Sequence, residues 1–347
     1  MSADAGRRST FVASCVDLLK QYGFDGLDMD WEYPANQGGS PADKGNFVQL
    51  LRDLKAAFAP NGFLLTAAVS AGKNTIDTAY DVPGMSQTLD YISVMAYDMH
   101  GAFDSYTHHN APLFALPLDQ SHNNQYFNDD FAVRYWLSLG APKEKLVMGM
   151  PVYGRGFTLA DPSNNGFYAP TAGAGTAGPY TREAGILGFN EICEIQKQYG
   201  DFKRIWNDDI KAPYCTFNSN QWFGYDDTES ITQKAQLIVN LGLAGGMVWS
   251  VETDDFQGKC GLGNNPILNT IKKVLNGQSP PNEATTKAPG GRCSSAGYFA
   301  AGSCSPKFYY CLPNNGQWII YDLSCAAGTI YYRGSCVWSN ASPECQG

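Results

Sequence analysis

The chain has 347 residues, of which 44% are hydrophobic and 16% charged, an ordinary mixture for a globular protein with a large core. Its 24 Lys and Arg against 33 Asp and Glu give a formal net charge of −9. This acidity argues against nucleic acid and anionic membranes as partners, and no run of about 18 apolar residues predicts a membrane span.

Short apolar runs alternate with amphipathic stretches over most of the chain. The runs predict strands at 24–32, 63–70, 89–98, 145–154 and 244–252. The stretches predict helices at 9–23, 44–58, 128–140, 230–242 and 265–277. Apolar strands that are each followed by a helix are typical of a parallel sheet covered by helices. A Gly- and Tyr-rich segment at about 156–222 interrupts this order and predicts an inserted α+β subdomain.

The composition changes at 277–292, where Pro, Gly, Ser and Thr predict an extended linker. Six of the ten cysteines follow within the last 55 residues: Cys293, Cys304, Cys311, Cys325, Cys336 and Cys345. This density predicts a disulfide framework and an extracellular, secreted protein. The N-terminal MSADAGRRST has no apolar core and is no secretory signal, so we expect the beginning of the protein to be missing.

The stretch FDGLDMDWEYP, residues 24–34, concentrates acidic side chains in a predicted strand. Side chains alternate along a strand, so Asp28, Asp30 and Glu32 share one face, roughly 6.5–7 Å between neighbours. Three like charges in a row are costly unless a function uses them. In parallel βα folds the chemistry lies at the carboxyl ends of the strands, which is where this stretch ends.

Further candidate site residues fall at the ends of the predicted strands. They are tyrosines, a tryptophan, an acid, a methionine and an arginine: Tyr33, Met95, Tyr97, Asp98, Tyr153, Arg155 and Trp249. Aromatic faces stack on sugar rings, and carboxylates bind or protonate them, so we expect a neutral polyhydroxylated ligand. Glu32 is the candidate general acid, since neighbouring acids and partial burial both raise a carboxyl pKa. The residues leave Asp30 and Asp98 open as the nucleophile of an ordinary retaining glycosidase.

A metal site is the competing interpretation of the same acids. Asp28, Asp30 and Glu32 could hold a divalent cation, and all four histidines, His100, His108, His109 and His122, fall in one loop region. However, no H-x-x-x-H pair lies on a predicted helix, and the aromatic residues suit a sugar better. We therefore expect no metal and no other cofactor.

These residues resemble the family 18 glycoside hydrolases, specifically animal chitinases. Residues 24–34 match the D-G-x-D-x-D-x-E signature of the fourth barrel strand, and four motifs match later strands in order: MAYD (95–98), GMPVYGR (149–155), QWFGYDD (221–227) and GGMVWS (245–250). The resemblance implies a TIM (β/α)8 barrel, here incomplete and holding strands four to eight in residues 1–276. At roughly 30 residues per βα unit, about 90 residues are missing.

The resemblance also implies substrate-assisted hydrolysis of chitin with retention of configuration. Glu32 is then the acid, while Asp30 orients the acetamido group of the substrate and Asp28 lies deeper. Tyr97 holds the acetamido oxygen, Asp98 completes the hydrogen-bonded set, and Trp249 lies beneath the distorted sugar. Tyr33, Met95, Tyr153 and Arg155 join the substrate-binding residues. Phe103 stands where many relatives have Trp, so we expect weaker stacking there. Catalytically inactive chitin lectins share this fold, and they are the alternative.

The tail, residues 293–347, is similar to a peritrophin-A type chitin-binding domain. Its candidate chitin-facing aromatic residues are Trp318, Tyr321, Tyr331, Tyr332 and Trp338. In the first domain, the resemblance implies a disulfide between Cys193 and Cys260, and we expect Cys15 to be a buried free thiol. The expected partners are chitin and chito-oligosaccharides, bound by a monomer.

Overall fold

The computed structural model describes residues 1–277, 297–301, 305–314, 317–325, 329–332 and 335–338. The chain forms two compact units, Met1–Pro280 and Pro281–Gly347, and the boundary between them falls within the segment predicted as a linker. Most of that linker, residues 278–292, lies outside the described residues. Within the described parts, no helix is both long and apolar enough to cross a membrane.

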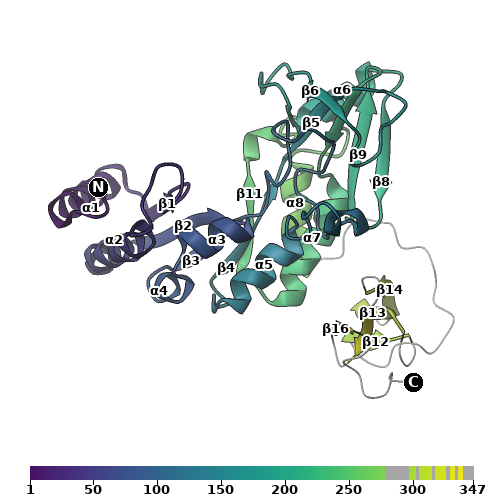
Figure 1. Cartoon of the computed structure of the whole chain (residues 1–347). Coiled ribbons are helices and arrows are strands. Elements are labelled where there is room, and N and C mark those ends of the chain that lie inside the picture. The colour runs from purple at the N-terminus through teal and green to yellow at the C-terminus, as the bar shows by residue number, and fades with distance from the viewer. Residues whose placement is uncertain (278–296, 302–304, 315–316, 326–328, 333–334, 339–347) are drawn as a thin grey trace. The chain divides into compact units, whose positions relative to one another are not determined.

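A five-stranded parallel sheet organises the first unit (Figure 1). Its strands, in spatial order, are β1 (Gly26–Asp30), β2 (Leu64–Ser70), β3 (Tyr91–Met95), β4 (Leu146–Pro151) and β11 (Gly245–Trp249). Each strand lies within one of the predicted runs. β1 pairs only with β2 and β11 only with β4 in the described part of the chain, so both are edge strands of an open sheet.

Helices alternate with the parallel strands, as predicted. They are α1 (Ala5–Tyr22), α2 (Asp43–Phe58), α5 (Asp129–Ser138), α7 (Thr228–Leu241) and α8 (Pro266–Leu275). Side-chain caps determine where several begin: Asp4 accepts from the Arg7 amide at the start of α1, and Asp227 caps α7. Two short helices between β2 and β3, α3 (Lys73–Ala79) and α4 (Val82–Ser86), were not predicted.

The main hydrophobic core lies on the inner strands. Leu65, Ala67 and Val69 of β2 and Ile92 and Val94 of β3 are fully buried. By contrast, no residue of β1 or β11 is fully buried, because each has one neighbouring strand among the described residues. In Figure 1, α1 and α2 lie at the β1 end of the sheet, and α7 and α8 lie near β11.

The insertion is an α+β subdomain, as predicted, with an antiparallel sheet in the order β6-β5-β10-β9-β8 and β7 paired with β5. Its elements are β5 (Tyr153–Leu159), β6 (Thr171–Ala174), β7 (Ile186–Gly188), α6 (Phe189–Gln198), β8 (Lys203–Asn207), β9 (Ala212–Phe217) and β10 (Gln221–Gly224). Phe157, Trp222 and Phe223 fill its interior. Gly156 allows the Phe223 ring to pack directly on the backbone, since a Cβ there would lie 2.2 Å from the ring.

The second unit contains a three-stranded antiparallel sheet, β12 (Gly297–Ala300), β13 (Lys307–Asn314) and β14 (Gln317–Ser324), and a hairpin, β15 (Thr329–Tyr332) and β16 (Ser335–Trp338). Cys325 is buried and disulfide-bonded. Cys293, Cys304 and Cys345 lie outside the described residues. The backbone of β13 to β16 carries the remaining predicted residues, whose side chains are not described: Cys311, Trp318, Tyr321, Tyr331, Tyr332, Cys336 and Trp338.

Candidate active site

The acidic stretch predicted as the site lines a cleft of about 620 Å³ at the carboxyl ends of the parallel strands. Asp28, Asp30 and Glu32 all face this cleft. The last ladder pair of β1 joins Asp30 to Ala68 of β2, so Glu32 lies just beyond the strand. Alternation along β1 therefore places Asp28 and Asp30 on one side, and Glu32, just past the end of the strand, faces the same cleft.

The cleft also receives most of the other predicted residues. Tyr33 follows β1, Met95, Tyr97 and Asp98 lie at the end of β3, and Trp249 ends β11. The Trp249 side chain is 57% exposed, which leaves an aromatic face free for a ligand. Acids and aromatic rings thus meet at one mouth, which is the combination that binds a sugar chain.

The three carboxylates have different environments. Partial loss of hydration raises the pKa of Asp30, although the residue is exposed, and the charges of Glu32 and then Asp28 raise it further. Asp28 accepts a hydrogen bond from the Thr66 hydroxyl on the neighbouring strand. Asp28 lies further back along β1 than Glu32, as expected. However, Glu32 was expected to be partly buried, and both residues are exposed, because no further strand pairs with β1 among the described residues.

Two tyrosines in the cleft remain neutral hydrogen-bond donors over the physiological range. Burial is the main cause that raises the pKa of Tyr33 above its usual value, followed by its hydrogen bond with Glu32. Burial and then the charge of Asp98 raise the pKa of Tyr97. The Tyr97 hydroxyl has a weak contact, 3.9 Å, with the sulfur of Met247, so it is available to a stronger acceptor.

Asp98 connects the cleft to the insertion. Its Oδ1 accepts hydrogen bonds from the Tyr153 hydroxyl and from Arg155 Nε, both at 2.5 Å, and its side chain is 40% exposed. Tyr153 and Arg155 therefore bind Asp98 and do not line the cleft itself. Phe103, predicted as a stacking residue, is 68% exposed outside the cleft lining, and the Arg155 guanidinium lies 5.9 Å from its ring centroid.

Several contributors to the site were missed. Thr66, Ser93, Phe127 and Met247 line the cleft, and buried Asn110 bonds to the backbone of Asp98. Thr66 and Ser93 lie on predicted strands, so the alternation of those strands could have indicated them. Phe127 and Asn110 are in the long loop after β3, where no periodicity indicates which side chains point inward.

The four histidines have other partners than a metal. His100 contacts Asp104, His108 contacts Asp119, and His109 contacts the Tyr225 carbonyl, while the ring of His122 stacks on Tyr168. Burial lowers the pKa of His108 to about 4 and that of His109 to about 3, so both are neutral near pH 7. Within the described residues, no three His, Cys, Asp or Glu side chains form a metal-binding group.

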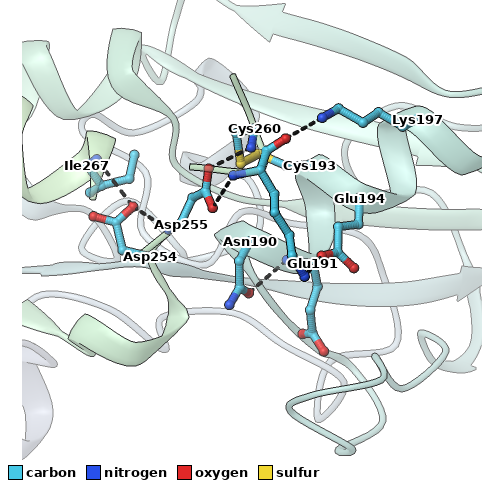
Figure 2. Close-up of a disulfide and its surroundings, with 10 residues drawn as sticks. Asn190, Glu191, Cys193, Glu194, Lys197, Asp254, Asp255, Cys260 and Ile267 are labelled. Atoms are coloured by element: carbon cyan, nitrogen blue, oxygen red, sulfur yellow. Dashed lines mark hydrogen bonds and ion pairs between the residues drawn. A yellow bond between two sulfur atoms is a disulfide. The ribbon is translucent and has the colours of Figure 1, made fainter. Parts of the chain in front are cut away.

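A disulfide between Cys193 and Cys260 joins α6 to the loop that follows β11, with Cα atoms 5.3 Å apart (Figure 2). Asp255 shapes this loop by accepting hydrogen bonds from the amides of Lys259 and Cys260. Asn190 of α6 donates to the Glu252 carbonyl, three residues beyond Trp249. The insertion therefore holds the chain that follows Trp249 through this disulfide and this hydrogen bond. Cys15 is a buried free thiol as expected, and so is Cys215.

Comparisons with known proteins agree with this arrangement. The model of the glycosyl hydrolases family 18 matches residues 1–254. Chitotriosidase-1 of Mus musculus is 42% identical over 284 residues, which are 80% of this chain and 60% of that protein. The chain spans only 12% of another curated relative, Probable chitinase 10 of Drosophila melanogaster, to which it is 43% identical over 277 residues.

Solved structures support the same fold. The Group IV chitinase of Ostrinia furnacalis, in complex with allosamidin, matches with a TM-score of 0.78 and 45% identity over 80% of this chain and 75% of that one. Human YKL-39, described as a pseudo-chitinase with retained chitooligosaccharide binding properties, matches with a TM-score of 0.74 and 37% identity over 79% and 75%. These likenesses confirm an α/β fold of the TIM-barrel type with an insertion. The chain belongs to the glycosyl hydrolases family 18.

Proposed function

We propose that the protein is a chitinase that hydrolyses β-1,4 linkages between N-acetylglucosamine units with retention of configuration. The observation that carries this proposal is the cleft in which Asp28, Asp30 and Glu32 face Tyr97 and Trp249. Carboxyl groups supply acid catalysis, and the exposed indole supplies a stacking surface.

In the proposed mechanism, the N-acetyl oxygen of the substrate attacks the anomeric carbon while Glu32 protonates the leaving oxygen. The bond to the leaving sugar breaks, and a cyclic oxazolinium ion forms. Asp30 orients the acetamido N–H and stabilises the positive charge. Water then opens the ring, with Glu32 accepting its proton. The raised pKa of Asp30 supports an exchange of protons within the acidic row, and the neutral Tyr97 hydroxyl is placed to bind the acetamido oxygen.

We propose this activity for a protein in which the sheet is closed. An eight-stranded barrel has no edges, whereas β1 and β11 each lack a second neighbour among the described residues. Large apolar side chains lie exposed beside these strands, including Phe24 and Leu64 at 54% and 46%. Three further strands, about 90 residues at roughly 30 per βα unit, would cover these apolar side chains and complete the sugar cleft.

We further propose that residues 293–347 bind chitin and hold the catalytic unit on the insoluble polymer. The cysteine-rich composition and the short antiparallel strands of this unit support a small domain held together by disulfides. Disulfide formation also supports secretion into an extracellular medium. The active species is proposed to be a monomer.

The test is Glu32→Gln in the full-length protein, with Glu144→Gln as a matched change at an exposed position outside the cleft. We expect Glu32→Gln to bind chitopentaose like the parent but to lose about 10²–10⁴-fold in kcat, the contribution of a positioned general acid. Glu144→Gln should turn over like the parent. Binding without turnover in the parent itself would favour a lectin, as in the relative YKL-39, and would overturn the proposed activity.

A further inference from the structure

The backbone of Asp98 adopts a positive φ. Its φ is 56°, in the left-handed region that residues other than glycine seldom adopt. In this conformation Oδ1 meets both the Tyr153 hydroxyl and Arg155 Nε while the side chain borders the cleft. The left-handed turn costs free energy, so contacts elsewhere must hold it.

Asn110 supplies these contacts. Its side-chain oxygen accepts from the Asp98 amide at 2.9 Å, and its side-chain nitrogen donates to the Tyr153 carbonyl at 3.0 Å. Its own carbonyl accepts from the Met99 amide at 3.0 Å. A single planar amide therefore joins the turn after β3 to the start of β5, and only an Asn or Gln side chain carries both a donor and an acceptor in this form.

Asn110 is itself held in place from both sides. It is fully buried. On one side, His109 contacts the Tyr225 carbonyl at 2.9 Å, and on the other, the Ala111 carbonyl accepts from buried Lys234 at 2.6 Å. Gly224 leaves room for this segment, because a Cβ there would lie 2.9 Å from the His109 backbone. The position of Asn110 is therefore determined by the core and not by the cleft.

We propose that Asn110 is a positioning residue that sets the carboxylate of Asp98 against Tyr153 and Arg155, and so against the bound sugar. This inference rests on the proposed chitinase activity. It assigns to Asn110 no contact with substrate. Losing the bridge frees the Asp98 turn to leave the left-handed region, and the carboxylate then moves relative to the sugar. A shift of about 1 Å can reduce turnover by about 10²-fold.

The test is a double-mutant cycle in the full-length protein. Asn110→Ala should lower kcat/KM by about 10- to 100-fold and weaken the Kd of chitopentaose by about tenfold. Asp98→Gly removes the carboxylate and keeps the turn, since glycine adopts positive φ readily. In that background, Asn110→Ala should cost less than about threefold in either quantity, because coupled residues are not additive. Asn110→Asp, which keeps the volume but loses the donor to Tyr153, provides a second variant if Asn110→Ala folds poorly.

Asn128→Ala is the matched control. Asn128 is also buried, and its amide likewise accepts from one backbone N–H, that of Phe131, at 2.9 Å and donates to one carbonyl, that of Gln125, at 3.0 Å. It should lower Tm about as much as Asn110→Ala while kcat/KM stays at the parental value. Equal losses from both variants, or a full loss from Asn110→Ala on top of Asp98→Gly, would overturn the proposal. If the parent protein has no turnover, the proposed chitinase activity is refuted instead. The double-mutant cycle measured by the Kd of chitopentaose would still decide the role of Asn110.

Discussion

Lys234 is a fully buried charge in the first unit, and replacing it should destabilise the protein strongly. Its Nζ lies 2.8 Å from Asp226 and 3.1 Å from Asp129, and all three side chains are fully buried. Lys234→Met keeps most of the volume but leaves the buried Asp226 carboxylate, with Asp129 beside it, without a cation. Removing one partner of a buried ion pair costs about 3–5 kcal/mol, which corresponds to a fall in Tm of roughly 10 °C.

Asp129→Asn is the control for this prediction. Burial raises the pKa of Asp129 to about 8, and neither of its oxygens accepts a hydrogen bond of good geometry among the described residues. Asp129 therefore carries a proton near pH 6, and the neutral Asn replaces it at little cost. Since the folded-state pKa is raised, the stability that this group contributes is present below about pH 4 and is lost as the pH rises towards 8.

Chemical denaturation of the parent and both variants at pH 5.5 and 8 measures these effects. The parent should lose stability relative to Asp129→Asn between the two pH values, and Lys234→Met should be much less stable than either at both. If Lys234→Met costs less than about 1 kcal/mol, or if Asp129→Asn costs as much as Lys234→Met, the assignment of charges in this cluster is refuted.

Two further predictions concern the disulfides. Replacing Cys193 and Cys260 together by Ala should lower the free energy of unfolding by about 2–4 kcal/mol, because this disulfide closes a long loop with a sequence separation of 67; unchanged denaturation would contradict a stabilising role. In a pull-down with colloidal chitin, the full-length protein should be retained better than a version that ends at Gly277, and reduction should abolish the difference. Retention that survives full reduction would contradict a disulfide-held chitin-binding domain.

The parallel strands were predictable because each is a short apolar run with a helix after it. Their ends were less predictable: the run at 24–32 contains β1 only from Gly26 to Asp30, since ladder pairing with β2 ends at Asp30. The short helices α3 and α4 were not predicted, because each spans fewer than eight residues and shows little periodicity. One of them, α4, begins where Asp81 accepts from the Gly84 amide, a local cap and not a pattern.

The site was predictable where it follows strand alternation and not where it depends on tertiary contacts. Asp28 and Asp30 face the cleft because they alternate along β1, and Glu32 follows directly after its end. The sequence places Arg155 near acids but does not show that Asp98 is its partner, a pairing that depends on how β5 approaches the turn after β3. Asn110 was harder to predict, because the sequence gives no sign that a single Asn in a loop is buried, as the structure shows it to be.

The central claim, that the acetamido group of the substrate acts as the nucleophile, is tested most directly by the anomer released first. Proton NMR of the full-length protein cutting chitopentaose should show the β-anomer before mutarotation, because two successive displacements at the anomeric carbon retain its configuration. Chitosan without acetyl groups should resist cleavage in the same assay. An initial α-anomer, or rapid hydrolysis of fully deacetylated chitosan, would contradict the mechanism.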